Sequence, residues 1–186
     1  MISEEALAKK FSVRTRVSSL AKVRPASVLV AISGEGREAK ILLTKRTETL
    51  PTHKGQLSFP GGKRDDSDLD DVSAALREAH EEVGLDPALV RVLGRLDDLV
   101  TISNYKITPV VAWIPSGLVF VPNPAEVAAI VQIPLHVVVE PPRAKTLLGE
   151  GLRRMVIFFE HDGHVVWGAT ASILRQLARV IRDEDV

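Results

Sequence analysis

Three glutamates in one nine-residue stretch have the residue type and spacing to do chemistry. The stretch is REAHEEVGL, residues 77–85, in which Glu78 and Glu82 are four positions apart. In a helix these two side chains share a face, and Glu81 lies about 60° or more from both, further toward solvent. Two carboxylates about 5 Å apart repel by about 3 kcal/mol when half-buried at an effective dielectric of 20. If this face is buried, we therefore expect a cation beside it.

The spacing by itself leaves two interpretations open. A hard divalent ion such as Mg²⁺ binds carboxylate oxygens and keeps waters that substrate phosphates can replace. Alternatively, the glutamates form a solvated helix face on which Arg77 pairs with Glu81 four residues later.

A glycine turn upstream favours the metal. The residues FPGG, 59–62, follow a short strand-like run, and an aspartate-rich link then leads into the helix. Glycine lets the backbone approach a ligand closely, so the carbonyl group of Gly62 could join the carboxylates at the ion.

This arrangement resembles the Nudix box of the Nudix hydrolases. The matching residues are Gly62, five further residues, Asp68 and then REAHEEVGL. Two features depart from the general box, which has Glu at the position of Asp68 and one residue fewer between that acid and Arg77. The coenzyme A pyrophosphatase branch has the same longer box. Its upstream signature is similar to LLTKRTETLPTHKGQLSFPGG, residues 42–62, and a third element is similar to VWGATASIL, residues 166–174.

The resemblance implies a divalent-metal hydrolase. Its ion, Mg²⁺ or Mn²⁺, is expected on Glu78 and Glu82, with Glu81 at the same cluster or at a second ion and with the carbonyl group of Gly62 as a further ligand. The ion would neutralise a diphosphate and lower the pKa of the attacking water.

The same resemblance assigns roles to the surrounding charges. Arg77 is expected to orient the glutamates without touching substrate. Many family members carry a further glutamate outside the box, and Glu126 is the candidate, although its residue type and position favour a structural charge at a strand entry. The proton acceptor stays open among Glu78, Glu81 and Glu126.

Substrate contacts are expected from the signature segment. Cationic side chains beside a metal suit a substrate with several phosphates. The candidates are Lys45, Arg46 and His53, together with the glycines Gly61 and Gly62. Pro51 stands where the branch more often has a polar or basic residue.

The leading hypothesis is hydrolysis of coenzyme A, or a derivative, to 4′-phosphopantetheine and 3′,5′-ADP. One alternative is a Nudix pyrophosphatase for another nucleoside diphosphate derivative, such as ADP-ribose or a dinucleotide. The other is a Nudix-fold binding module without turnover.

Composition restricts the class of protein. The 186 residues carry 24 basic and 24 acidic side chains, and 45% are hydrophobic. A balanced charge gives no support to a nucleic-acid or membrane surface, so we expect a small-molecule substrate. There is no cysteine, which excludes disulfides and thiolate chemistry. Without an apolar leader or spanning run, the expectation is one cytoplasmic domain over residues 1–186, of undetermined oligomeric state.

The elements that position the site follow from periodicity. Val72, Leu76, Ala79 and Val83 form the apolar stripe of the glutamate helix, which Gly84 should end. The acids before it, residues 65–71, are expected at the helix entry, one of them as a cap, with Asp71 the least certain because it lies one heptad before Glu78. The basic residues of 13–24 are expected to be a solvated connector.

The rest of the chain predicts more strands than helices. Helices are expected over 2–11, within 134–142 and from Thr170 to Ile181, and strands over 26–33, 40–46, 90–101, 105–114, 126–134, 153–161 and 164–167. This pattern indicates an α/β fold, which the resemblance specifies as a Nudix-type α/β/α sandwich around a mixed β-sheet.

Overall fold

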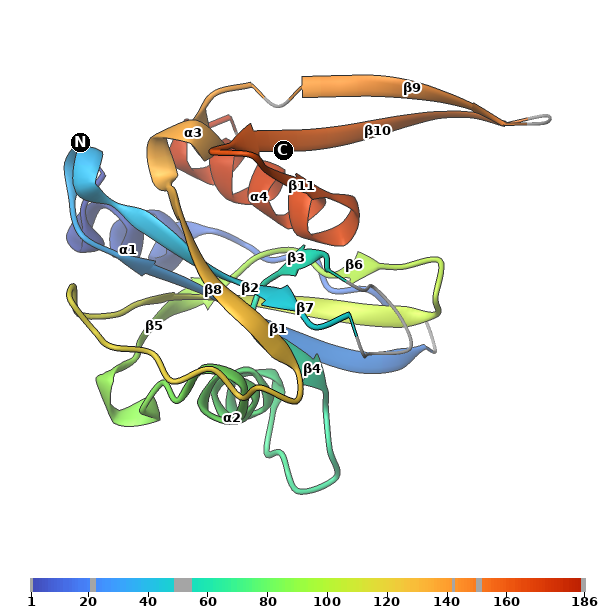
Figure 1. The fold of residues 1–186 in the computed structure, drawn as a ribbon. Helices are drawn as coiled ribbons and strands as arrows, with labels where there is room; N and C mark the ends of the chain where they lie inside the picture. The colour runs from blue at the N-terminus through green and yellow to red at the C-terminus, as the bar shows by residue number, and fades with distance from the viewer. Residues whose placement is uncertain (1, 21–22, 49–54, 142, 150–151, 185–186) are drawn as a thin grey trace.

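The computed structural model describes residues 2–20, 23–48, 55–141, 143–149 and 152–184. A mixed β-sheet forms the middle layer, with helix α2 on one face and helices α1 and α4 on the other (Figure 1). This is the α/β/α sandwich that the sequence predicts. Among the described residues, no helix combines the length and apolar character needed to cross a membrane.

The described elements follow in chain order. They are α1 Glu4–Val13, β1 Arg24–Ser33, β2 Lys40–Arg46, β3 Leu57–Ser58, β4 Gly61–Lys63, α2 Asp71–Val83, β5 Arg91–Arg95, β6 Leu99–Val100, β7 Tyr105–Trp113, β8 Val127–Pro134, α3 Leu135–Val139, β9 Arg143–Gly149, β10 Leu152–His161, β11 His164–Trp167 and α4 Gly168–Ile181.

The two central strands pair at one end and separate at the other. Strands β1 and β2 pair only next to their turn, where Ile32 lies opposite Ile41. At the far end β3 pairs with β2 and β4 pairs with β1, so residues 57–63 lie between the two strands as a wedge. The amide of Leu29 donates to the carbonyl oxygen of Pro60 at 2.8 Å, which fixes the FPGG turn in this gap.

Alternation along β1 and β2 supplies two hydrophobic cores. Leu29 and Leu42 pack with Ala79 under α2, whereas Val30 and Leu43 pack in the larger core beneath α1 and α4. Since successive strand residues point to opposite faces, each position in these strands can be assigned to one helical layer.

The long strand expected over 90–101 is wrong, because it is broken into β5 and β6. Arg95 pairs with Val110 of β7, and pairing resumes only at Leu99, opposite Ile107. The break lies opposite Pro109, which has no amide hydrogen to donate to a neighbouring strand. Leu96 can still donate to the carbonyl oxygen of Pro109, at 3.0 Å.

A second, three-stranded sheet follows α3. The expected hairpin is present as β10 and β11, which pair with Phe158 opposite Trp167. Strand β9 was not predicted, and it pairs with β10 as a hairpin that extends beyond α4 (Figure 1). The run RAKTLLG, residues 143–149, has no sustained alternation of polar and apolar residues from which a strand could be predicted.

Candidate active site

Helix α2 begins and ends at local signals. The side chain of Asp70 accepts hydrogen bonds from the amides of Val72 and Ser73, at 3.0 and 2.8 Å, and the hydroxyl of Ser73 accepts one from the amide of Asp70. Gly84 ends the helix with a left-handed φ of 67°. One acid of the entry segment is thus a cap, as expected.

Two other acids of that segment make specific contacts, whereas the sequence predicted only a place at the helix entry for them. Asp71 contacts Arg64, with 3.6 Å between the charged atoms, and accepts a hydrogen bond from the hydroxyl of Thr108 at 3.3 Å. Asp68 is buried and accepts two hydrogen bonds from the guanidinium of Arg77, both at 3.0 Å. This pairing lowers the pKa of Asp68, and a paired carboxylate of this kind fixes the direction of the arginine.

Arg77 in turn contacts two of the glutamates. Its guanidinium donates to Glu81 at 2.9 Å, lies 3.1 Å from Glu78 and donates to the carbonyl oxygen of Lys63 at 3.1 Å. The i, i+4 pair with Glu81 is the contact that the solvated-face interpretation required. With Asp68 behind it, however, Arg77 also connects α2 to β4.

The three glutamates differ in burial. Glu82 is only 3% exposed, Glu78 is half-buried, and the side chain of Glu81 is 54% exposed. The carboxylate of Glu82 accepts a hydrogen bond from the amide of Gly61. The helical face of Glu78 and Glu82 is therefore buried against the glycine turn, whereas Glu81 points toward solvent.

Burial and mutual repulsion raise the pKa of both inner glutamates. Burial is the main cause for Glu82, and with the nearby charges of Glu126 and Glu78 it raises the pKa of Glu82 to about 8. The pKa of Glu78 is also raised, first by burial, although Arg77 opposes the shift. These carboxylates are short of positive charge, so a cation at this position would stabilise them.

Gly62 lies directly against Glu78. A Cβ atom at position 62 would come within 2.5 Å of the carboxylate of Glu78, so only glycine leaves room for this approach. Gly61 is in the left-handed half of backbone space, with φ 155°, and a Cβ there would meet the carbonyl oxygen of Ser27 at 2.4 Å. Both glycines are required by close approach, and the amide of Gly61 is used to hold Glu82.

Strands β2 and β8 bring two further candidates to this place. Arg46 lies opposite Val127, and the amide of Thr47 donates to the carbonyl oxygen of Glu126 at 3.0 Å. The charges of Arg46 and Glu126 both act on Glu82, in opposite directions. The structure thus gathers Glu78, Glu82, Glu126 and Arg46 at one end of the sheet.

The remaining candidates do not all join this cluster. Lys45 precedes Arg46 and by strand alternation points to the opposite face, toward the layer of α1 and α4. His53, like Pro51, lies outside the described residues. The expected single group of cations is therefore divided by the sheet.

The donor set fits a hard divalent ion. Glu78 and Glu82 present carboxylate oxygens, the ligand type that Mg²⁺ and Mn²⁺ prefer, in a place short of positive charge. In the described part of the chain, no three acidic or histidine side chains are already arranged around one point. The carboxylate of Glu78 lies 3.1 Å from the guanidinium of Arg77 and also against Gly62.

A second network of charged side chains was not predicted from the sequence. Asp98 accepts hydrogen bonds from Arg16, from the hydroxyl of Thr108 at 2.9 Å and from the amide of Ser19 at 2.9 Å. Arg14 similarly donates to Asp97 at 2.6 Å. The basic segment expected to be a solvated connector is therefore fixed to the loop before β6, and no local pattern connects residues some 80 positions apart.

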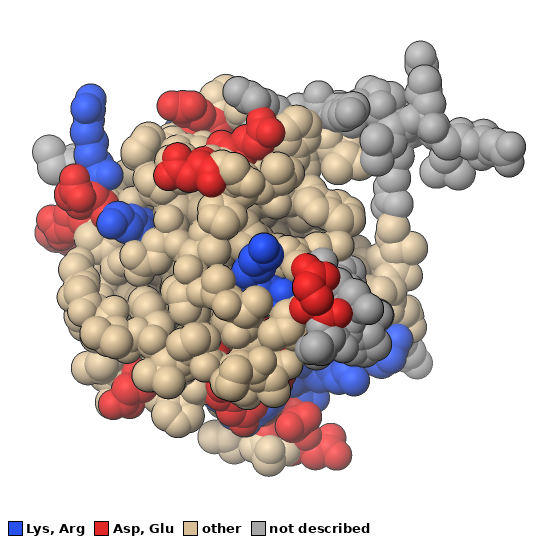
Figure 2. Space-filling model, viewed as in Figure 1, with Lys and Arg blue, Asp and Glu red and all other residues tan. Residues whose placement is uncertain are grey.

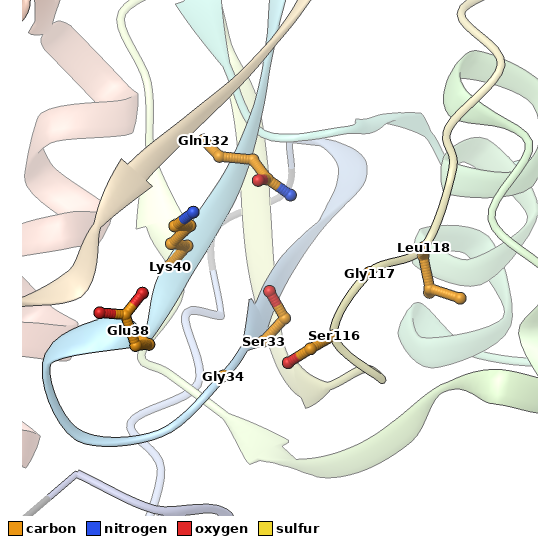
Figure 3. Close-up of a pocket in the computed structure, with 8 residues that line it drawn as sticks. All are labelled: Ser33, Gly34, Glu38, Lys40, Ser116, Gly117, Leu118 and Gln132. Carbon is orange, nitrogen blue, oxygen red and sulfur yellow. The ribbon is translucent and has the colours of Figure 1, made fainter.

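A hollow elsewhere on the surface is separate from this cluster. It has a volume of about 270 Å³ and lies between the β1–β2 turn and the segment after β7 (Figure 3). Ser33 in its lining is six residues along β1 from Ser27, which pairs with Gly62, so the two places are about 20 Å apart. On the face in Figure 2, acidic and basic residues are scattered without a large patch of one sign.

Comparisons with known proteins agree with this geometry. The NUDIX domain family model matches residues 23–148. Two relatives named "Uncharacterized Nudix hydrolase NudL", from Yersinia pestis (strain Pestoides F) and Yersinia pseudotuberculosis serotype O:1b (strain IP 31758), are each 40% identical over 160 residues. That alignment covers 85% of this chain and 80% of each relative.

Solved structures share the fold at low identity. The Nudix hydrolase RenU from M. smegmatis aligns with a TM-score of 0.59 and 21% identity, covering 88% of both chains. The MutT protein from Methanosarcina mazei Go1 aligns with a TM-score of 0.56 and 14% identity, covering 93% of this chain and 99% of its own. The matched domain, the relatives and the glutamate helix lead to one conclusion: this chain belongs to the Nudix family and is a hydrolase of diphosphate linkages in nucleoside diphosphate derivatives.

Proposed function

We propose that this Nudix hydrolase cleaves the diphosphate linkage of coenzyme A or a coenzyme A derivative, giving 4′-phosphopantetheine and 3′,5′-ADP. The observation that carries diphosphate cleavage is the position of Gly62 against Glu78, with Glu82 buried beside them. The choice of coenzyme A is supported by the signature of residues 42–62, which continues without a gap into the glycine turn.

Nudix hydrolases generally need divalent metal ions, and we propose Mg²⁺ or Mn²⁺ for this one. Its ligands would be Glu78, Glu82 and the carbonyl oxygen of Gly62, with Glu81 at the same cluster or at a second ion. When bound, the ion would neutralise the negative charge of the diphosphate and lower the pKa of the attacking water. Arg77, held by Asp68, keeps Glu78 and Glu81 directed along the helix face.

Two further residues would bind the substrate phosphates and accept the proton of the attacking water. Arg46 supplies a guanidinium on the glutamate side of the sheet, where it can bind phosphate oxygens in pairs. Among the three candidate bases, Glu126 is the one we assign. Glu81 and Glu78 both contact Arg77, whereas no cation lies within ion-pair distance of Glu126 among the described residues. A carboxylate not committed to a cation is the better proton acceptor.

A substrate panel tests the coenzyme A assignment. Coenzyme A, ADP-ribose and a diadenosine polyphosphate would be compared at equal Mg²⁺ or Mn²⁺, with kcat/KM as the measure. We expect the highest value for coenzyme A or one of its thioesters. A wide preference for ADP-ribose or the dinucleotide would contradict coenzyme A as substrate and leave the hydrolase assignment intact.

Product analysis in ¹⁸O-labelled water tests the reaction itself. We expect one labelled oxygen in either 4′-phosphopantetheine or 3′,5′-ADP, which also shows which phosphorus is attacked. Release of inorganic phosphate, or of products that retain the diphosphate, would contradict cleavage of this linkage.

A further inference from the structure

Arg46 lies at the end of a sheet strand, where its charge acts on the buried Glu82. It is the last residue of β2, and Leu42, four residues earlier, packs under α2. The pairing with β8 is irregular between Lys45 and Arg46, but the action of the Arg46 charge on Glu82 places Arg46 on that same face, while Lys45 points to the other face. Two neighbouring cations of equal charge therefore have different surroundings.

The backbone around Arg46 is fixed, but its guanidinium is not fully bonded. The amide of Arg46 donates to the carbonyl oxygen of Gln56 at 3.0 Å, and the amide of Thr47 donates to the carbonyl oxygen of Glu126. The Nε atom of Arg46, however, is buried and has no hydrogen-bond partner among the described residues. A buried donor without a partner is costly, and such groups are often satisfied only when a ligand is bound.

The negative charge of the glutamates explains why the Arg46 side chain is stable in this position. Arg77 is occupied by Asp68, Glu81 and Glu78. The charge of Arg46 acts to lower the pKa of Glu82, whereas the charges of Glu126 and Glu78 act to raise it. In the ion-free protein Arg46 supplies part of the positive charge that a divalent ion would supply.

We propose that Arg46 is a placeholder cation, which balances Glu82 until the metal ion binds and then turns to the phosphates of the substrate. This inference rests on the proposed metal site. The same side chain then opposes ion binding and favours substrate binding. As a consequence, substrate that engages Arg46 should tighten ion binding, and by linkage the ion should tighten substrate binding equally.

Substitution of Arg46 by Gln has two effects of opposite sign. Mn²⁺ titration of the substrate-free protein, followed by electron paramagnetic resonance, should give a Kd about fivefold lower than in the wild type, because a nearby positive charge is gone. The KM for the hydrolysed substrate should rise about tenfold, because a charge-assisted contact to phosphate is lost. A merely structural role for Arg46 would not tighten Mn²⁺ binding.

Matched variants make the result decisive. Lys45→Gln removes the same charge one residue away on the other face, so its Kd for Mn²⁺ should stay within about twofold of the wild type. Arg46→Lys keeps the charge and should restore the wild-type Kd, but it cannot reproduce the two-pronged phosphate contact, so its KM should stay raised.

An unchanged or higher Kd for Mn²⁺ in Arg46→Gln would overturn the placeholder role. Failure of the metal site itself gives a different result, since Glu82→Gln would then leave Mn²⁺ binding unaltered. If Glu82→Gln weakens Mn²⁺ binding at least tenfold while Arg46→Gln does not tighten it, the site stands and the inference about Arg46 falls.

Discussion

Two buried carboxylates, Asp98 before β6 and Glu82 in the last turn of α2, have opposite electrostatic surroundings. The side chain of Asp98 is 1% exposed, and Glu82 is 3% exposed. Burial acts to raise the pKa of Asp98 as well, but hydrogen bonds from Ser19, Arg16 and Thr108 outweigh it, and the net shift is downward. Glu82 has one amide donor and two acidic neighbours, and its pKa rises to about 8.

The difference separates a structural carboxylate from one that we propose to be functional. Asp98 has its counter-charge built into the fold, so it fixes the segment that contains Arg16 against β7. Glu82 lacks a full counter-charge, which costs stability unless a cation is supplied from outside. Unmatched acids are therefore a better guide to the site than buried acids in general.

Glu82→Gln should produce the largest effect on activity. The substitution keeps the shape of the side chain and removes one ligand of the proposed ion, so kcat/KM should fall by about 10²–10³. Circular dichroism should show an unchanged fold. Hydrolysis at the wild-type rate in this variant would mean that the unmatched acids are not the site.

Asp98→Asn should have the reverse profile. Removing the charge leaves Arg16 without its main partner, and the free energy of unfolding should fall by about 3 kcal/mol in urea titrations. The kcat of the folded fraction should stay near the wild-type value, because Asp98 lies outside the glutamate cluster. A loss of kcat as large as that of Glu82→Gln would erase the distinction between the two acids.

The pH dependence of stability should also separate the two acids. A folded-state pKa raised from 4.5 to about 8 means that the folded protein holds a proton on Glu82 which the unfolded chain releases. The stability from that proton is complete below pH 4.5 and is lost as pH rises to 8. Without metal, thermal unfolding should show this decline, and Glu82→Gln should reduce it. A decline of the same size in Glu82→Gln would assign it to another group.

Gly62→Ala should have the smallest effect of the four predictions that compare these acids and their surroundings. The added methyl group meets the carboxylate of Glu78 at 2.5 Å, and the carboxylate can move because it is the end of a flexible side chain. We expect about a tenfold loss of kcat/KM, with stability changed by less than about 1 kcal/mol. Kinetics and urea unfolding of the same preparation measure both. A large loss of stability with normal kinetics would make Gly62 a folding residue only.

Local signals in the sequence predicted the parts of the site that lie close together in the chain. The helix of Glu78 and Glu82, its end at Gly84 and the close approach of Gly62 follow from periodicity, glycine chemistry and the resemblance. The single strand over 90–101 failed because its break depends on Pro109 of a neighbouring strand.

The sequence by itself determined the chemistry available to this protein: three glutamates on one helix turn, a glycine pair before it and cations upstream, all within 45 residues. Only the tertiary structure decided how charge is matched. It buried Glu82 beside Glu126, divided Lys45 from Arg46 across the sheet and joined Asp98 to Arg16 across 82 residues. The physical reason is that an electrostatic partner is set by distance and burial in the folded chain, which one-dimensional spacing does not encode beyond the reach of a single helix or hairpin.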